Sequence, residues 1–228
     1  MKFMKLAIIG YGKMGKTILR LAPNYAFSEF VIIDNEEDWL NKQDALKNCD
    51  VAIEFSTPQT VSSNLMRCFE LHLPVVSGTT GSPAHEEAFL SSMKNKSISF
   101  VYGSNFSIGA NIFFKLNKYL AQQMNLQRQY QVSIEETHHV HKKDAPSGTA
   151  LTIKQTILSQ FDTPLSIPVV SHREGEVIGE HLVTYKSDED LIEIKHCAQN
   201  RDSFAHGALK AAVWLLQHPG IYAFEEVF

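Results

Sequence analysis

Short apolar runs alternate with amphipathic stretches along the first hundred residues. The apolar runs predict strands at residues 6–9, 30–33, 50–55, 74–77 and 97–102. Apolar residues at helical spacing predict helices at 16–22 and 60–71, and a further helix is expected after Gly81. Apolar strands that are separated by helices favour a parallel sheet covered on both faces. We therefore predict an α/β domain with a doubly wound, Rossmann-like parallel sheet.

The pattern changes after residue 107 and indicates a second, smaller α+β domain. Residues 110–124 form one long stretch with apolar side chains at helical spacing. Strands are predicted at 130–136, 180–186 and 190–195, with a helix at 148–161. Because the last two strands follow each other without a helix, we expect a partly antiparallel sheet. An alanine- and leucine-rich helix at 205–217 is expected to pack back on the first domain.

These patterns divide the chain into two domains. We expect residues 1–106 and 203–228 to form a dinucleotide-binding domain, and residues 107–202 to form a substrate-binding and oligomerisation domain. The chain has 228 residues, of which 44% are hydrophobic and 20% charged. It is therefore long enough for two domains that each bury a core.

Composition excludes several classes of protein. The net charge of −4 argues against a general binder of nucleic acid, which needs an excess of basic residues. No window reaches the roughly 18 apolar residues of a membrane helix, and the apolar run near the start is too short for a signal peptide. Cys49, Cys68 and Cys197 are odd in number and widely spaced, which favours reduced thiols and a cytoplasmic location.

A glycine-rich loop follows the first predicted strand and opens a helix. It reads Gly10-Tyr11-Gly12-Lys13-Met14-Gly15, a GxGxxG pattern. Glycines allow a tight turn, close approach of a pyrophosphate and close packing of helix on strand, and the helix N-terminus offers amide donors. Asp34 ends the second strand, where an acidic side chain accepts hydrogen bonds from ribose hydroxyls. The pattern predicts a dinucleotide site; the alternative is a glycine turn that binds no ligand.

Two more loops end strands at the same edge of the predicted sheet, where ligands of doubly wound folds bind. They are Gly78-Thr79-Thr80-Gly81 and Gly103-Ser104-Asn105-Phe106, and each would otherwise be an ordinary polar turn. Asn35 follows Asp34, so no arginine stands there to bind a 2′-phosphate. We therefore expect NADH to serve at least as well as NADPH, although Lys13 is able to reach a phosphate.

The densest chemistry lies at the end of a predicted strand, in residues 135–149, which read EETHHVHKKDAPSGT. A histidine donates a proton near neutral pH, and a neighbouring lysine binds a carboxylate and assists as an acid. Gly148 and Thr149 begin a helix, so their amides and the threonine hydroxyl suit a carboxylate. The combination predicts a site for a small dianion with a proton donor beside it.

Two other interpretations of this segment stay open. His139 and His141 would share one face of a strand and could ligate a metal ion. Lys142 and Lys143 would repel a dication, and no third ligand pattern accompanies the histidines, so we expect no metal. The segment could also be a solvated, charged strand end.

A hydride donor and a proton donor beside a small dicarboxylate define a type of reaction, the reduction of a C=C bond conjugated to an imine. Hydride reaches one carbon, and the enamine that forms is protonated on the other. Cationic and amide groups would hold the carboxylates, and the substrate domain would close to exclude water.

These residues resemble the dihydrodipicolinate reductase (4-hydroxy-tetrahydrodipicolinate reductase) family of the diaminopimelate route to lysine. The matching stretches run in family order over almost the whole chain, at residues 10–15, 78–81, 104–107, 135–151 and 201–215. The segment 138–149 is the most specific of them. The resemblance implies reduction of 4-hydroxy-tetrahydrodipicolinate to tetrahydrodipicolinate by NADH, NADPH or both. It also implies a homotetramer that associates through the substrate-domain sheets.

The resemblance implies a role for each matching position. His138 would be the general acid and Lys142 the second proton donor. His139, Gly148 and Thr149 would hold the substrate carboxylates, with Thr80 nearby. The cofactor would lie against residues 10–15, Asp34, residues 78–80 and residues 103–106. Asn35 stands where family members often have an arginine, so tight binding of a 2′-phosphate is not expected.

Two rival functions belong to other classes. Another two-domain dehydrogenase would oxidise a stable alcohol or amine, and it leaves the histidine and lysine cluster unexplained. A non-catalytic module that senses NADH would bind the cofactor without turnover, and a change at His138 would not affect it. A charged cluster at a strand end suits a buried protein interface poorly.

Overall fold

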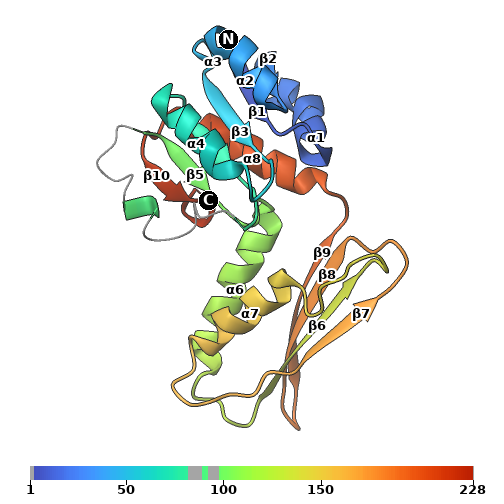
Figure 1. The fold of residues 1–228 in the computed structure, drawn as a ribbon. Coiled ribbons are helices and arrows are strands. Elements are labelled where there is room, and N and C mark those ends of the chain that lie inside the picture. The colour runs from blue at the N-terminus through green and yellow to red at the C-terminus, as the bar shows by residue number, and fades with distance from the viewer. Residues whose placement is uncertain (1–2, 82–88, 92–97, 228) are drawn as a thin grey trace. The chain divides into compact units, whose positions relative to one another are not determined.

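The computed structural model describes residues 3–81, 89–91 and 98–227. The chain divides into two compact units (Figure 1). Unit 1 comprises Met1–Ile108 and Asp202–Phe228, and unit 2 comprises Gly109–Arg201. The helix expected after Gly81 lies largely outside the described residues. Within those residues, no helix is long and apolar enough to cross a membrane.

Unit 1 is built on a six-stranded sheet in the order β10-β5-β4-β3-β1-β2, and its strand pairs are parallel. The strands are β1 (Met4–Ile9), β2 (Phe27–Ile33), β3 (Val51–Glu54), β4 (Val75–Ser77), β5 (Phe100–Tyr102) and β10 (Ile221–Ala223). The strand order reverses at β1, which has β2 on one side and β3 on the other. Doubly wound sheets bind ligands at the carboxyl end of such a reversal. The predicted fold class is confirmed.

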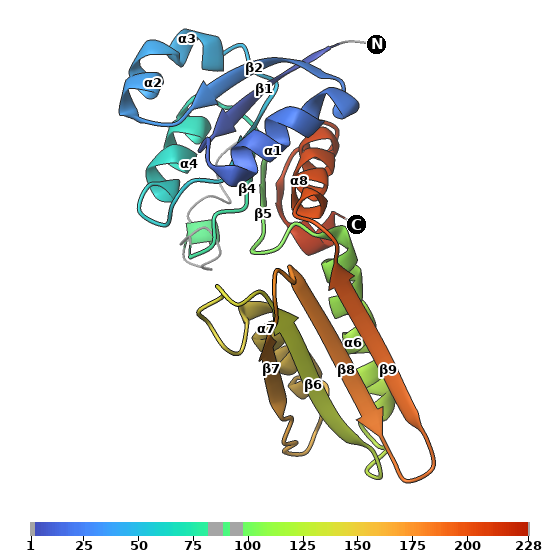
Figure 2. The same ribbon diagram turned by 90° about the vertical axis from the view of Figure 1, so that its right-hand side faces the viewer.

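Helices cover both faces of this sheet (Figure 2). Helices α1 (Lys13–Leu21) and α8 (Asp202–Leu215) pack on the face that carries Leu6 and Ile8, and α4 (Val61–Glu70) packs on the face of Ala7 and Ile9. The short helices α2 (Glu36–Asn41) and α3 (Gln43–Leu46) follow β2. Because both faces of β1 are buried from Leu6 to Ile9, this part of the strand is apolar.

Unit 2 is a four-stranded mixed sheet in the order β7-β6-β8-β9. Strand β6 (Gln131–His138) pairs in parallel with β7 (Val169–Arg173) and antiparallel with β8 (Gly179–Lys186), which pairs antiparallel with β9 (Leu191–Ala198). Helices α6 (Ile108–Met124) and α7 (Gly148–Leu158) cover one face and share a core with it (Figure 2). Strand β7 was not predicted from the sequence, and neither was β10.

Alternate residues of β6 face the core of unit 2. Val132 and Ile134 pack among apolar side chains, and the next two residues on the same face, Glu136 and His138, are also buried. Glu136 lies opposite His181 of β8, which is buried too. The inner face of the sheet therefore changes from apolar to ionisable towards the carboxyl end of β6. This end carries the chemistry of unit 2.

Candidate active site

The glycine loop joins β1 to α1, and steric contacts require two of its glycines. Gly10 has a φ of +87°, and a Cβ there would lie 2.2 Å from the carbonyl oxygen of Phe55. A Cβ on Gly15 would lie 2.2 Å from the carbonyl oxygen of Gly10. A Cβ on Gly12, in contrast, would meet nothing within 4 Å. The first and third glycines therefore serve the fold, while the second leaves space open beside the backbone.

Helix α1 begins directly after Gly12, three residues before its predicted start. Among the described residues, no side chain caps this end of the helix. Unpaired amides in the first turn of a helix carry partial positive charge and bind phosphate groups. The open space at Gly12 and the uncapped helix end together fit a pyrophosphate.

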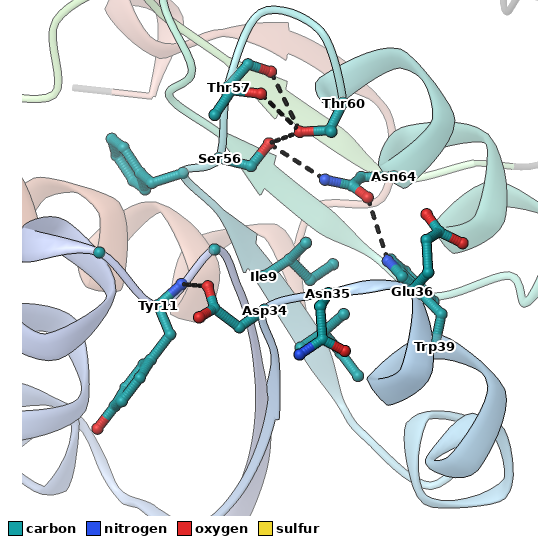
Figure 3. Close-up of a pocket in the computed structure, with 14 residues that line it drawn as sticks. Ile9, Tyr11, Asp34, Asn35, Glu36, Trp39, Ser56, Thr57, Thr60 and Asn64 are labelled. Atoms are coloured by element: carbon teal, nitrogen blue, oxygen red, sulfur yellow. Dashed lines mark hydrogen bonds between the residues drawn. The ribbon is translucent and has the colours of Figure 1, made fainter.

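A cavity of about 400 Å³ lies beside the loop, at the carboxyl ends of β1, β2 and β3 (Figure 3). The backbone amide of Tyr11 donates a hydrogen bond of 2.8 Å to the Asp34 carboxylate, which holds this side chain at the glycine loop. The Asn35 side chain caps α2 by accepting a 2.9 Å hydrogen bond from the amide of Asp38. Glu36 also lines the cavity. Arg67 donates hydrogen bonds of 3.1 and 2.7 Å to the two carboxylate oxygens of Glu36. The Asp34 carboxylate is therefore the one that suits ribose hydroxyls and disfavours a 2′-phosphate.

A second cavity, of about 430 Å³, shares Gly12, Phe55 and Ser56 with the first. Seven more of the predicted cofactor residues line it, namely Lys13, Met14, Gly78, Thr79, Thr80, Ser104 and Phe106. The two cavities therefore adjoin at the second glycine of the loop. Together they extend along the carboxyl edge of the sheet, as a dinucleotide requires.

Three predicted residues line neither cavity and shape the loops instead. A Cβ on Gly103 would lie 2.9 Å from the Cβ of Phe224, so Gly103 permits close packing there. Asn105 accepts a hydrogen bond of 2.9 Å from the backbone amide of Ser107. The third residue is Gly15, whose packing role is described above.

Sequence reasoning missed Glu54, the last residue of β3, whose side chain is fully buried. Its carboxylate accepts hydrogen bonds from the Ser77 hydroxyl at 2.6 Å and the Thr79 hydroxyl at 2.9 Å. The amide of Ser56 donates to it at 3.0 Å, and the Ser56 hydroxyl donates as well. Glu54 therefore ties the ends of β3 and β4 together beneath the cavities. The available signal was an acidic residue inside an apolar run.

Hydrogen bonds continue from Ser56 into the wall of the first cavity (Figure 3). The Ser56 hydroxyl oxygen accepts a 3.1 Å hydrogen bond from the Asn64 side-chain amide. Asn64 accepts one of 3.1 Å from the indole of Trp39. This chain of contacts fixes the side chains that line the cavity.

In unit 2, the buried end of β6 holds a charged cluster. Nδ1 of His138 is hydrogen-bonded to the Glu136 carboxylate, and Nη2 of Arg173 lies 3.0 Å from Glu136. The His181 ring meets the His138 ring edge to face, with centroids 5.2 Å apart. Nε2 of His181 lies 3.2 Å from the hydroxyl oxygen of Ser147. The predicted acid, His138, is therefore surrounded by ionisable side chains from three strands.

Burial and charge shift the pKa values in this cluster. Burial lowers the pKa of His138, Glu136 opposes this shift, and the cations Lys142 and Arg173 add to it. Burial also lowers the pKa of His181, to about 4, so this ring is neutral at pH 7. Burial alone would raise the pKa of Glu136, but hydrogen bonds from Ser171 and Arg173 and the charge of His138 hold it below its usual value. Glu136 is thus ionised at neutral pH.

Lys142 lies in the loop after β6. Its Nζ lies 2.7 and 2.8 Å from the two carboxylate oxygens of Asp144, and this hydrogen bond lowers the pKa of Asp144. Arg173 donates a 2.6 Å hydrogen bond to the backbone carbonyl of Asp144. The loop that carries Lys142 is therefore attached to the same arginine as Glu136.

The helix predicted to begin at Gly148 does so, but it ends at Leu158 rather than at residue 161. The Ser147 hydroxyl caps it by accepting a 3.1 Å hydrogen bond from the amide of Ala150. Gly148 is exposed in the first turn, and a Cβ there would meet nothing within 4 Å. The Gly148 amide also hydrogen-bonds to the Asp144 carboxylate and lowers its pKa, so this helix end already interacts with an anionic group of the protein.

The expectation that His139 and His141 share a strand face is wrong. Strand β6 continues to His138 and ends there, so both residues lie in the following turn, with ring centroids 6.1 Å apart. Within the described part of the chain, the potential ligand group is Glu136, His138 and His181 instead. The Arg173 guanidinium beside Glu136 makes this a poor place for a second cation.

Comparison with known proteins identifies the family. The profile named "Dihydrodipicolinate reductase, N-terminus" matches residues 4–106, and the one named "Dihydrodipicolinate reductase, C-terminus" matches residues 109–228. A curated relative from Christiangramia forsetii is 40% identical, and the match covers 98% of this chain and 97% of the relative. The chain belongs to the dihydrodipicolinate reductase family. That relative is named 4-hydroxy-tetrahydrodipicolinate reductase, and the resemblance noted from the sequence is confirmed.

Solved structures show the same fold. A dipicolinate-bound dihydrodipicolinate reductase from Paenisporosarcina sp. TG-14 has a TM-score of 0.80 at 22% identity, with 100% of both chains covered. An aspartate dehydrogenase from Thermotoga maritima has a TM-score of 0.54 at 14% identity, with 92% of this chain and 95% of that one covered. The fold is therefore shared with other dehydrogenases. The family match, not the fold, separates this reductase from the rival dehydrogenase.

Proposed function

We propose that this family member reduces 4-hydroxy-tetrahydrodipicolinate to tetrahydrodipicolinate with NADH or NADPH, in the diaminopimelate route to lysine. One structural observation carries the proposal. In unit 2, a histidine bonded to a carboxylate, a lysine and the N-terminus of a helix lie on one short segment, residues 136–149. These are the groups that a dicarboxylate substrate and its protonation need.

The residues of unit 1 fit a dinucleotide. Gly10 and Gly15 allow the tight loop, Gly12 leaves room for a pyrophosphate, and Asp34 is placed to accept from ribose hydroxyls. Ser104 and Phe106 line the second cavity, with the loop at residues 78–80. When it is bound there, the nicotinamide supplies a hydride. The carboxylate of Asp34 favours NADH over NADPH.

Residues of unit 2 hold the substrate and supply its proton. His138 is the general acid, and Lys142 is the second proton donor and a cation for one carboxylate. Gly148 and Thr149 hold a carboxylate at the N-terminus of α7. His139 belongs to the same proposed group, and its Nδ1 is buried without a hydrogen-bond partner among the described residues. Thr80 of unit 1 completes the proposed set.

The protein also works as a cytoplasmic homotetramer in this proposal. The face of the unit 2 sheet opposite its helices is solvent-exposed in this chain and carries Val170 and Leu191, about half exposed, among charged residues. The three cysteines of the protein are free, as suits a reducing compartment. A mass by light scattering near that of one 25.7 kDa chain would exclude the tetramer.

The first experiment follows oxidation of NADH and NADPH with substrate made in place from pyruvate and aspartate semialdehyde by the upstream synthase. We expect oxidation that depends on the synthase and is faster with NADH. Reduction of NAD⁺ or NADP⁺ by a stable alcohol or amine would instead favour the rival dehydrogenase. NADH binding without turnover would favour the sensing module.

Variants in the same assay test the roles of the residues. His138→Gln is expected to lower kcat by about 10²–10⁴-fold, the range for loss of a general acid. Lys142→Ala should lower it comparably and also raise KM, because a carboxylate loses its cation. Near-normal rates in both variants would refute these roles without affecting the family assignment.

A further inference from the structure

The His138 imidazole has two nitrogens, and the protein occupies one of them. Nδ1 is hydrogen-bonded to Glu136, and an ionised carboxylate only accepts hydrogen bonds. Nδ1 therefore carries a hydrogen in both protonation states of the ring. The proton that His138 gains and loses must then be the one on Nε2.

We propose that Glu136 is a positioning residue that holds His138 with Nε2 as its proton-donating atom, and that Arg173 fixes Glu136 for this task. The inference rests on the proposed role of His138 as general acid. It adds Glu136 and Arg173 of unit 2 to the residues that support the reaction, both acting through His138. It also identifies Nε2 as the ring atom that donates the proton.

Strand register explains how these residues come together. Glu136 and His138 are two positions apart on β6, so their side chains share its inner face. Arg173 is the register partner of His138 on the parallel neighbour β7. The Glu136 carboxylate therefore lies between the His138 imidazole and the Arg173 guanidinium. Both of these partners are on strands rather than on loops.

Arg173 is itself firmly held. It donates 2.6 Å hydrogen bonds to the backbone carbonyls of His172 and Asp144 and a 3.4 Å one to that of Lys142. Its side chain is 20% exposed, and that of Glu136 is fully buried. A buried carboxylate needs such a partner, since desolvation would otherwise favour its neutral form.

The other nitrogen of His138, Nε2, lies beside Gly179. A Cβ at Gly179, the first residue of β8, would lie 3.0 Å from Nε2. The backbone conformation of Gly179 does not require glycine, but a side chain at this position would crowd Nε2 of His138. The glycine therefore keeps a side chain away from the donor atom.

The proton transfer balances with these groups alone. The Nε2–H bond breaks, its electron pair stays on Nε2, and a C–H bond forms on the enamine carbon. His138 is left neutral, with its remaining hydrogen on Nδ1 bonded to Glu136. Solvent returns a proton to Nε2 before the next cycle.

Four groups set the charge around His138. Glu136 on its own strand favours the protonated ring, whereas Arg173 of β7 and Lys142 of the loop disfavour it. His181 of β8 is neutral at pH 7. Loss of the Glu136 charge thus lowers the pKa of His138. Since a general acid works only when protonated, the fall in kcat/KM at high pH moves to lower pH.

The test combines NMR with a pH profile. In wild-type protein, ¹⁵N shifts of His138, assigned with His138→Gln, are expected to show the Nδ1–H tautomer at high pH. In Glu136→Gln, the His138 titration and the alkaline fall in kcat/KM should both move down by about one pH unit or more. At pH values below both transitions, the variant rate should approach that of the wild type.

Glu135→Gln is the matched control. Glu135 is the preceding residue of β6, its side chain is about half exposed, and it lies on the opposite face near His172. The same substitution there should leave the titration of His138 and the pH profile unchanged. A shift in both variants would indicate a general charge effect and would contradict the proposal.

The remaining outcomes distinguish the positioning role of Glu136 from the role of His138 as general acid. An Nε2–H tautomer in wild-type protein would overturn the role of Glu136 even if Glu136→Gln fails to fold. An unchanged pH profile in Glu136→Gln, with a large loss in His138→Gln, would overturn it too and leave the acid in place. A normal rate in His138→Gln would instead refute the acid itself.

Discussion

Two buried carboxylates in this protein are stabilised in different ways. Glu136 faces the guanidinium of Arg173, whereas Glu54 accepts hydrogen bonds from hydroxyl and amide groups of Ser56, Ser77 and Thr79. Hydrogen bonds to a carboxylate are stronger than those between neutral groups. Glu54 thus fixes two loops at the cofactor cavities without adding a positive charge there.

We predict that Glu54→Gln destabilises unit 1 and weakens NADH binding. The amide group of glutamine presents a donor where the native oxygens accept several hydrogen bonds. Disruption of such a buried site costs about 1–3 kcal/mol, and the loops that line the cavities lose their fixed positions. Urea unfolding and a fluorescence titration with NADH measure the two effects.

Glu29→Gln is the control for this prediction. Glu29 lies on β2 of the same unit, and its side chain is 70% exposed beside Lys5. Exposed ion pairs contribute little, so both stability and NADH affinity should stay close to wild type. An unchanged NADH affinity in Glu54→Gln would show that the buried network serves stability alone.

At the scale of single residues, the sequence revealed the segment around His138 but not its partners. Glu136, Arg173 and His181 lie on three different strands, and the registers of β6 with β7 and β8 bring them together. Nothing in the order of residues shows such a register. Arg173 also lay on a strand that the sequence did not predict.

At the scale of elements, predictability follows burial. Strands β1, β3 and β4 are buried on both faces, so they appear in the sequence as apolar runs. Strand β7 is half-exposed and contains Ser171, His172 and Arg173, so it lacks both an apolar run and an alternating pattern. Strand β10 has three residues and is too short for a periodic signal. The fold class was therefore predictable, and so were the edge strands β2 and β9, whereas the edge strands β7 and β10 were not.

The junction of β1 and α1 allows a test that separates folding from binding. We predict that Gly15→Ala lowers the free energy of unfolding by about 1–3 kcal/mol, the usual cost of overpacking. Its Cβ would lie 2.2 Å from the carbonyl oxygen of Gly10, so helix and strand must move apart. Gly12→Ala should change stability by less than about 1 kcal/mol.

For NADH affinity we expect the reverse: Gly12→Ala should have a larger effect than Gly15→Ala. The methyl group of Gly12→Ala meets no protein atom within 4 Å and occupies the space proposed for the pyrophosphate. We expect its Kd for NADH to rise about tenfold or more, equivalent to about 1.4 kcal/mol. Calorimetric titration and urea unfolding of both variants provide the comparison. An unchanged Kd in Gly12→Ala would place the pyrophosphate elsewhere.

At the scale of the whole molecule, the buried histidines make stability depend on pH. Burial lowers the pKa values of His138, His181 and His196, so each takes up a proton more readily in the unfolded chain. At pH values below the pKa that these histidines have in the unfolded chain, unfolding is therefore accompanied by proton uptake. Acid pH thus favours unfolding. The stability that depends on these histidines being neutral is fully present above about pH 6.5 and is lost as the pH falls towards their pKa values in the folded protein.

His181 should contribute most to this dependence. Its pKa changes from the usual 6.5 to about 4 on folding, which corresponds to about 3 kcal/mol lost between these pH values. We predict that the free energy of unfolding of unit 2, measured in urea, falls as the pH is lowered from 7 to 4.5, before most carboxylates titrate. His181→Gln should flatten this slope, whereas His141→Gln should not, since the His141 side chain is 74% exposed. An equal slope in wild type and His181→Gln would mean that His181 is protonated in the folded protein, and the cluster at the end of β6 would then carry one more positive charge than its geometry indicates.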